Sequence, residues 1–238
     1  MLALLLACTA PDEPTRFREV DDPGVVDDTA DTAEASPCPE GMALAGTVCI
    51  DVVEATVEGE LGDLNQGFDW PDGSTTAVAI PRLGEVPTTQ LSWYQAYAAC
   101  QNAGKHLCTV DEWRGACAPE GTRYPWGEQG APEDRCALVA PDNETPASEG
   151  LSATGSHPDC AGPEGVLDMI GNAWEWVDPG TADQGRPGTA KVGGAYYSGY
   201  GSGLCTAEPY LEHPPDFNGT IAARCCVAPV NLPTSRRR

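Results

Sequence analysis

Two stretches of the chain have the hydrophobic spacing of short amphipathic helices. Between residues 92 and 104, and again between 109 and 119, apolar side chains recur every three or four positions before a Gly or a Pro ends the pattern. Each stretch opens with a hydroxyl residue followed three positions later by Gln or Glu, which is the sequence pattern of a helix capping box. The two capping pairs are Ser92 with Gln95 and Thr109 with Glu112. The pattern predicts one short helix after each pair.

The other segments predict short strands and loops. Residues 38–51 contain two short apolar runs separated by Ala45-Gly46-Thr47, which predicts a β-hairpin. Residues 58–84 are polar, Gly-rich and without periodicity, so we expect a long loop or insertion there. With 27 Gly and 22 Pro in 238 residues, the chain favours turns over long helices. The expected class is an irregular α+β fold with short elements.

A third pattern is a compact aromatic and acidic segment at residues 165–176. Trp174 and Trp176 flank one carboxylate, and a second carboxylate lies seven residues before it. Indoles favour burial, whereas buried carboxylates are costly unless a cation or hydrogen bonds compensate them. Calcium, which takes about 6–8 oxygen ligands, has candidates in the side chains of Asp168 and Glu175 and the carbonyls of Gly171 and Ala173. The alternative is a tight turn with two core tryptophans and no metal.

The charge balance is strongly acidic, with 36 Asp and Glu against 13 Lys and Arg and a net charge of −23. Nucleic-acid binding needs clustered positive charge, so this balance argues against a nucleic-acid partner. The basic run Arg236 to Arg238 is interpreted as part of a solvated C-terminal tail over residues 231–238. No stretch is apolar and long enough to span a membrane.

The first 37 residues differ in composition from the rest. Residues 1–8 form an apolar run that resembles the end of a bacterial lipoprotein signal peptide, with Cys8 as the lipidated residue. No basic region precedes this run, which is consistent with a true start further upstream, and a plain secretory signal without lipid is the alternative. Residues 9–37 mix Asp with Pro, Thr and Ala and contain one aromatic residue, so we expect an acidic disordered tether. The folded domain is expected over residues 38–230.

Eleven cysteines indicate an oxidising location, the cell envelope or the exterior, because cytosolic thiols stay reduced and no C-x-x-C metal pair is present. If Cys8 carries lipid, ten cysteines remain and can form five disulfides. The local bonds we expect are Cys38–Cys49 and Cys117–Cys136, and a bond Cys160–Cys205 is a further expectation. Cys100 and Cys108 should pair with Cys225 and Cys226 in an order that the sequence leaves open.

Six motifs occur in the order found in formylglycine-generating enzymes, the sulfatase-modifying factors. They are Leu91-Ser-Trp93, Gly104-Lys-His-Leu-Cys-Thr-Val-Asp-Glu-Trp113, Tyr124-Pro-Trp-Gly127, residues 165–176, Val192-Gly-Gly194 and Ala223-Arg-Cys225. The resemblance implies a sulfatase-modifying-factor-like domain related to the C-type lectin fold, with calcium held by the segment from Asp168 to Glu175. A second calcium site of the family would follow Tyr124-Pro-Trp-Gly127, where this chain departs from the family with Asp134-Arg-Cys-Ala137.

The chain also departs from the family where the chemistry is expected. The enzymes that it resembles carry two cysteines, five residues apart, that bind Cu(I) and activate oxygen, and soft Cu(I) prefers such thiolates. Ser198 and Gly203 stand at the matching positions, and Cys205 nearby is a lone thiol. Copper is therefore not expected as a cofactor. The three histidines are too scattered for an iron site like that of related sulfoxide synthases.

A candidate ligand groove takes the place of the copper site. It consists of residues that stand among glycines, Tyr196, Tyr197, Ser198 and Tyr200, and it suits a glycan or a peptide. The alternative is a Gly-rich strand and loop whose tyrosines cover the core. Two functions follow: a non-catalytic, calcium-stabilised binding domain that contacts the membrane only through a lipid anchor, or a copper oxidase acting on protein cysteine. The missing thiolate pair favours the binding domain.

Overall fold

The structure is a computed structural model that describes residues 36–61, 75–118, 121–129, 135–139, 150–180, 182–183, 186–199, 201–211 and 219–230. The chain divides into two units, Met1–Ala35 and Ser36–Arg238. Cys8 with the expected signal segment, residues 9–35 of the expected tether, Tyr200 and the C-terminal tail lie outside the described residues. Within the described part, no helix has the length and apolar character needed to cross a membrane.

The predicted hairpin forms the start of a four-stranded sheet. Its strands β1 (Met42–Ala45) and β2 (Val48–Asp51) are antiparallel, and Gly46 makes the turn at φ +62°. From the other end of the chain, β12 (Cys225–Val227) pairs with β2, and β5 (His106–Leu107) pairs with β12. The order β1-β2-β12-β5 therefore joins segments from the beginning, middle and end of the domain.

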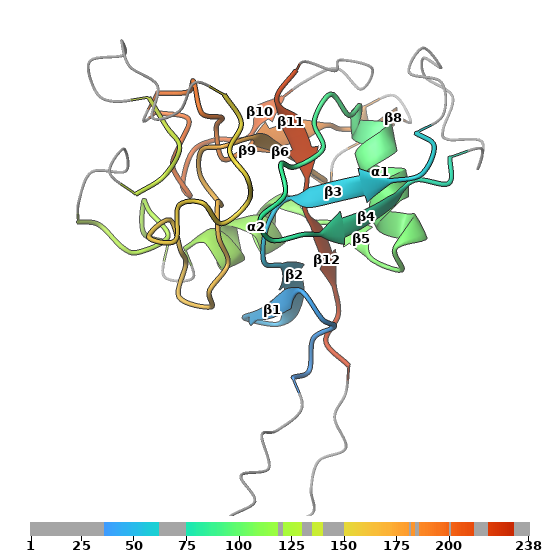
Figure 1. The fold of residues 1–238 in the computed structure, drawn as a ribbon, viewed down its shortest axis with the longest axis horizontal. Coiled ribbons are helices and arrows are strands. Elements are labelled where there is room, and N and C mark those ends of the chain that lie inside the picture. Colours follow the sequence, from blue (N-terminus) through green and yellow to red (C-terminus); the bar gives the residue numbers. More distant parts are fainter. Residues whose placement is uncertain are drawn as a thin grey trace, which may run out of the picture. The chain divides into compact units, whose positions relative to one another are not determined.

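A second four-stranded sheet has the order β10-β9-β6-β11. Within it, β6 (Trp174–Val177) is antiparallel to β9 (Ala190–Val192) and parallel to β11 (Ile221–Ala223). The edge strand β10 (Tyr210–Leu211) pairs with β9. Figure 1 shows this sheet at the end of the domain opposite to the β1–β2 hairpin.

Two short strand pairs complete the sheets. β3 (Ala55–Glu58) pairs with β4 (Val78–Pro81), and β7 (Ala182–Asp183) pairs with β8 (Arg186–Pro187). The prediction of a loop over residues 58–84 is therefore wrong at Glu58 and at β4. These strands form through backbone pairing between distant segments, and four residues are too few to show a strand period in the sequence.

Both predicted helices are confirmed. α1 spans Trp93–Asn102 and α2 spans Val110–Cys117, and both capping boxes form with reciprocal side-chain and backbone bonds. Gly104 follows α1 at φ +72°, a left-handed conformation that glycine adopts with little strain. Asp111 and Glu112 lie in the first turn of α2, where negative charge complements the helix dipole.

The core consists of two main apolar clusters. One joins α2 to the hairpin and to the 165–176 segment, and the other joins α1 to β6 and β11. Three buried indoles have satisfied N–H groups: Trp93 donates to the carbonyl of Val177 (2.9 Å), Trp113 to Glu175 (2.6 Å) and Trp176 to the carbonyl of Leu91 (2.8 Å). The core is thus organised by tryptophans that bond to β6 or come from it.

Five disulfides join the ten described cysteines. Cys38–Cys49 forms as expected, and Cys100 bonds Cys225 while Cys108 bonds Cys226, so the structure gives the order that the sequence left open. The expected Cys117–Cys136 and Cys160–Cys205 bonds are wrong, because the structure has Cys117–Cys205 and Cys136–Cys160. The last residue of α2 lies against the segment after β9, 88 residues later, and spacing along the sequence does not show such a contact.

Candidate functional site

Residues 168–175 form a tight, buried turn that leads into β6. Asp168 and Asn172 have positive φ values of +56° and +54°, and Gly171 has φ +81°. A Cβ at Gly171 would lie 2.3 Å from the carbonyl oxygen of Ala137, so glycine is required there. The backbone N–H of Asn172 donates to the same carbonyl (2.9 Å). Backbone geometry therefore fixes the positions of the two predicted calcium-binding carboxylates at the ends of this turn.

Glu175 is fully buried beside Arg224. Both carboxylate oxygens accept hydrogen bonds from the guanidinium at 2.7–3.0 Å, and Oε2 also accepts the indole N–H of Trp113 at 2.6 Å. Arg224 further donates to the carbonyls of Asp51 (2.8 Å) and Leu167 (2.9 Å). Burial alone would lower the pKa of Arg224, but Glu175 and the neighbouring carboxylates raise it. The guanidinium is therefore a permanent positive charge in the core.

Glu54 and Asp168 bring two further buried carboxyl groups to this place. Oε1 of Glu54 accepts the side-chain N–H of Asn172 (3.0 Å), whereas Oε2 is buried without a hydrogen-bond partner in the described structure. Burial, followed by the charge of Asp168, raises the pKa of Glu54 well above its usual range. Burial also raises the pKa of Asp168, whose Oδ2 accepts the N–H of Gly155 (2.6 Å). Sequence reasoning missed Glu54 because a lone acid carries no pattern.

This cluster fits a cation. Three buried carboxylates, Glu54, Asp168 and Glu175, stand against the single guanidinium of Arg224. A carboxylate has about four acceptor positions, and the four hydrogen bonds to Glu175 already take them up. The oxygen left without a partner is Oε2 of Glu54, so this atom is the acceptor that a cation such as Ca²⁺ would satisfy. Within the described residues, no three His, Cys, Asp or Glu side chains form a metal cluster by themselves, so carbonyl oxygens would have to complete the ligand set.

Neither position that matches the copper cysteines holds a thiol in this fold. Ser198 is buried, and its hydroxyl accepts the backbone N–H of Ala195 (2.9 Å) within a turn. A Cβ at Gly203 would lie 2.7 and 2.8 Å from the δ-carbons of Leu138, so a cysteine there would require this buried leucine side chain to shift. Cys205 is bonded to Cys117. Since all described cysteines are in disulfides, that part of the chain holds no free thiolate for Cu(I).

The predicted groove residues have different environments. Tyr197 is 47% exposed, its ring meets that of Tyr196 edge to face with centroids 5.1 Å apart, and its hydroxyl hydrogen-bonds the hydroxyl of Thr220. Ser198 is buried, and its hydroxyl accepts a bond within its own turn, so the residue offers little surface to a ligand. Tyr200 lies outside the described residues. The groove stays a prediction, and the adjacent Tyr196 and Tyr197 are the candidates whose surroundings the structure describes.

Sequence reasoning missed a second part of this surface, at the edge strand β10. Tyr210 and Leu211 are 60% and 73% exposed, and the ring of Tyr210 lies 6.2 Å from that of Trp174. The ammonium of Lys191 lies 5.1 Å from the centroid of the Trp174 ring and 5.2 Å from that of the Tyr210 ring. The backbone N–H of Trp174 donates to the backbone carbonyl of Thr220 (2.9 Å). A two-residue strand leaves no period in the sequence to detect. Thr220 and Trp174 thus connect Tyr197 to Tyr210, and we call the tyrosines linked by these contacts the aromatic end surface: Tyr196, Tyr197 and Tyr210.

The similarity to known proteins matches this architecture. Residues 26–223 match the family model described as a sulfatase-modifying factor enzyme 1-like domain. The chain belongs to this family. The formylglycine-generating enzyme of Mycobacterium tuberculosis is 30% identical over 132 residues, 50% of this chain and 44% of that protein. The hercynine oxygenase of the same organism is 30% identical over 117 residues, 45% and 26% of the two chains.

A third relative is named an inactive enzyme. The inactive C-alpha-formylglycine-generating enzyme 2 of Bos taurus is 32% identical over 114 residues, 45% of this chain and 38% of that protein. The chain thus spans between about a quarter and under half of the length of these curated relatives. Family membership therefore includes both oxidising enzymes and a protein described as inactive.

Solved structures confirm the fold class. Treponema denticola variable protein 1 superposes with a TM-score of 0.52 at 14% identity, covering 81% of this chain and 100% of that one. PvdO from Pseudomonas aeruginosa gives a TM-score of 0.51 at 15% identity, covering 75% and 79%. At such identities the likeness shows the fold alone, which is the expected irregular α+β, C-type-lectin-like and sulfatase-modifying-factor-like arrangement.

Proposed function

We propose that this domain is a non-catalytic binding module that presents the aromatic end surface to a glycan or a peptide. In this proposal it belongs to a bacterial lipoprotein of the cell envelope, anchored through Cys8 and the 9–37 tether. The observation that carries the proposal is the absence of a free thiolate pair among the described residues: Ser198 and Gly203 stand at the copper positions, and all described cysteines are in disulfides. Five disulfides suit an oxidising location.

The placement of the aromatic end surface supports a display role. The N–H of Val230 donates to the carbonyl of Pro37 (2.9 Å), so both ends of the folded domain lie together. They lie beside the β1–β2 hairpin, whereas β10 lies at the opposite end of the domain in Figure 1. A tether that joins the domain at Pro37 therefore starts on the side away from the surface that would bind the ligand.

Calcium has a structural role in this proposal. Asp168 and Glu175 would hold it through their side chains, and Gly171 and Ala173 through their carbonyls. When bound, the ion supplies positive charge to a buried cluster in which carboxylates outnumber the guanidinium. Arg224 keeps the Glu175 carboxylate in place by its hydrogen bonds. No chemical step is assigned to the ion.

Oxidation of protein cysteine is the second candidate function, and the name of one relative, a formylglycine-generating enzyme, favours it. The test is an anaerobic titration with Cu(I), followed by oxygen and a cysteine-containing sulfatase peptide. We expect neither one-to-one tight copper binding nor conversion of the peptide cysteine to an aldehyde. Both results together would overturn the binding-module proposal.

A matched variant tests the reason for the absence of copper binding. Ser198→Cys with Gly203→Cys restores the thiol pair in sequence but leaves Leu138 in place. We expect this double variant to bind Cu(I) poorly and the triple variant with Leu138→Ala to bind at least tenfold more tightly. Equal affinity of the double and triple variants would show that Leu138 does not close the site.

Ligand binding is tested with a glycan array and a displayed peptide library probed with the intact protein. Tyr197→Ala and Tyr210→Ala should each weaken binding of a selected ligand at least tenfold, because exposed aromatic anchors carry a large share of binding energy. Leu83→Ala, at an apolar residue that is 68% exposed outside this surface, is the control. Binding that is unchanged in both tyrosine variants would exclude the aromatic end surface as the ligand site.

A further inference from the structure

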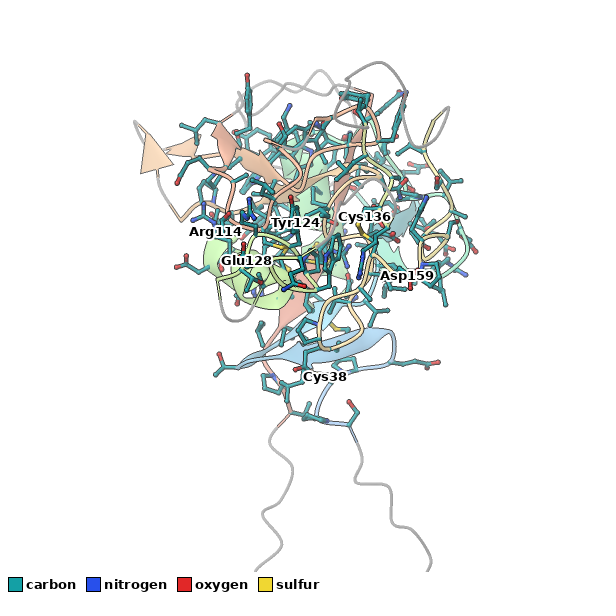
Figure 2. The ribbon with its side chains drawn as sticks, turned by 90° about the vertical axis from the view of Figure 1, so that its left-hand side faces the viewer. Cys38, Arg114, Tyr124, Glu128, Cys136 and Asp159 are labelled. Atoms are coloured by element: carbon teal, nitrogen blue, oxygen red, sulfur yellow. A yellow bond between two sulfur atoms is a disulfide. The ribbon has the colours of Figure 1, made fainter. Side chains whose placement is uncertain are left out.

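A cavity of about 640 Å³ lies apart from the aromatic end surface and from the 168–175 turn. Its walls come from two turns, residues 122–127 and residues 161–164. We call it the Trp126 pocket, after its largest lining side chain. Its volume is within the range of about 300–1,000 Å³ that is common for small-molecule sites. Figure 2 labels Tyr124, Glu128, Cys136 and Asp159, of which Tyr124 belongs to the first turn and Asp159 precedes the second.

Both walls are held by their own hydrogen bonds. In the first turn, Tyr124 and Gly127 exchange backbone N–H···O=C bonds of 3.2 and 3.0 Å. In the second, the N–H of Gly162 donates to the carbonyl of Val166 (2.9 Å) and the N–H of Gly165 to that of Gly162 (3.0 Å). The Cys136–Cys160 disulfide anchors the start of this second turn. The pocket is therefore formed before any ligand arrives.

The indole of Trp126 is held in an aromatic and cationic stack. The ring of Tyr124 is parallel to it within 7°, with centroids 5.3 Å apart, and the guanidinium of Arg135 lies 4.9 Å from its centroid. The indole N–H donates to the carbonyl of Gln129 (2.9 Å). Two groups thus already lie against the ring, which disfavours stacking of a flat sugar, and one of them, the guanidinium of Arg135, is a cation beside the pocket.

The chemistry of the lining favours a cationic ligand with an apolar body. Pro125, Pro163 and Ala161 add apolar surface, and Glu164 is the one charged residue of the described lining. Glu164 is exposed, and no ion pair within the described residues includes it. The neighbouring cation Arg123 is paired with Glu128 at 2.8 Å outside the lining. The carboxylate at the pocket is therefore open to a positively charged group.

We propose that the Trp126 pocket binds a primary ammonium group carried on an alkyl chain, with the chain against Trp126 and the prolines and the ammonium on Glu164. A lysine side chain of a partner peptide and a free aliphatic amine share this chemistry. The overall charge of −23 favours the approach of such cations. This site is independent of the aromatic end surface, and it does not rest on the proposed function.

The test uses four probes of similar length on the intact protein: hexylamine, hexanol, hexanoate and Nα-acetyl-lysine methylamide. Binding is followed through the indole N–H resonance of Trp126 in ¹⁵N-labelled protein. We expect hexylamine to shift this resonance saturably, about threefold to fivefold more tightly than hexanol, since one exposed ion pair contributes up to about 1 kcal/mol. A comparable affinity for the lysine derivative would identify a peptide side chain as the source, and weaker binding would identify a free amine.

Two variants complete the experiment. Glu164→Gln should reduce hexylamine affinity to that of hexanol without changing hexanol binding, while Asp159→Asn, at an exposed carboxylate outside the lining, should leave both unchanged. Preferred binding of hexanoate, equal binding of amine and alcohol in the wild type, or an unmoved Trp126 resonance would each overturn the proposal. The remaining amide resonances report whether each variant keeps its fold, so a misfolded variant is recognised independently.

Discussion

The turn at residues 168–175 and the loop at residues 194–205 illustrate how the same fold treats two polar segments differently. In the turn, Glu175 is completely buried and its carboxylate is bonded to Arg224 and Trp113. In the loop, Ser198 bonds within its own turn, Gly203 lies against Leu138, and Tyr197 is exposed. The turn is joined to the core by side-chain hydrogen bonds of a buried carboxylate, whereas the loop is joined by backbone hydrogen bonds and by the Cys117–Cys205 disulfide.

The two segments therefore differ in their importance: Glu175 is required for the stability of the fold, whereas positions 198 and 203 correspond to the copper-binding chemistry of the family. Loss of a donor to Glu175 would leave a buried charge, which is strongly unfavourable in any member of the fold. Ser198 and Gly203 are also buried but uncharged, so a change at either leaves no uncompensated charge in a segment that a disulfide holds in place. A scaffold can therefore lose the copper positions and keep its core, which is consistent with a family that contains both enzymes and a protein named inactive.

The largest expected loss of stability follows removal of the disulfide that holds the loop at residues 194–205. Cys117→Ala with Cys205→Ala removes a bond that spans 88 residues and should lower the free energy of unfolding by about 4–5 kcal/mol, from the chain-entropy relation. The control pair, Cys38→Ala with Cys49→Ala, spans 11 residues and should cost about 3 kcal/mol. Urea denaturation without reductant measures both. A larger loss in the control would contradict the comparison.

The second prediction concerns the hydrogen bonds between Arg224 and Glu175 in the turn. Arg224→Met leaves Glu175 as an uncompensated buried carboxylate, so the free energy of unfolding should fall by about 3–5 kcal/mol. Adding Glu175→Leu to this variant should recover part of the loss. The control Arg82→Met breaks an exposed pair with Glu58 and should change stability by about 0–1 kcal/mol. If both arginine variants had the same small effect, the central role of Arg224 would be refuted.

Removal of calcium gives the third prediction. If the turn binds Ca²⁺, a concentration one hundred times the dissociation constant stabilises the fold by about 2.7 kcal/mol, and a chelator should lower the melting temperature accordingly. Glu175→Gln should weaken this response, and Asp168→Asn should remove it with less disturbance of Arg224. If the melting temperature of the wild type does not change with chelator at low free calcium, the turn does not bind stabilising calcium.

Local patterns predicted the helices well because their signals lie within a few residues. Ser92 with Gln95 and Thr109 with Glu112 form the expected capping boxes. The hairpin and its Cys38–Cys49 bond were predictable for the same reason. In each case the partners are close in sequence, so the chemistry of the turn or cap decides the structure.

Long-range partners were not predictable from the pattern. Cys117 bonds Cys205 and Cys160 bonds Cys136, the reverse of the expected pairing, because the end of α2 packs against the loop after β9. Leu138 gives no sign in the sequence that it would fill the space beside Gly203. Arg224 belongs to the motif Ala223-Arg-Cys225, but the motif does not predict its hydrogen bonds to Glu175. This contact forms because the residue between β11 and β12 packs against the turn. The resemblance indicated the order of the parts, and packing decided which side chains met.

The smallest predicted effect is on the pH dependence of stability through the capping box of α2. This local interaction contrasts with the long-range Arg224–Glu175 and Cys117–Cys205 contacts. Burial alone would raise the pKa of Glu112, but the N–H and hydroxyl of Thr109 together with His106 hold it below the usual value of 4.5. A carboxyl group whose pKa is lowered in the folded state stabilises the protein above its unfolded pKa, and this contribution is lost as the pH falls through the lowered value.

Glu112→Gln should therefore flatten the acid side of the stability profile below about pH 4.5, with a loss of about 1 kcal/mol at neutral pH, since Gln can still accept the cap N–H while the charge is removed. Melting temperatures measured from pH 3 to pH 6 give the profile. Asp111→Asn, in the same first turn, is the charge-matched control and should leave the shape of the acid side unchanged. An equally flattened profile in both variants would assign the effect to the helix dipole rather than to the capping box, because the dipole acts on both carboxylates and the cap bonds only on Glu112.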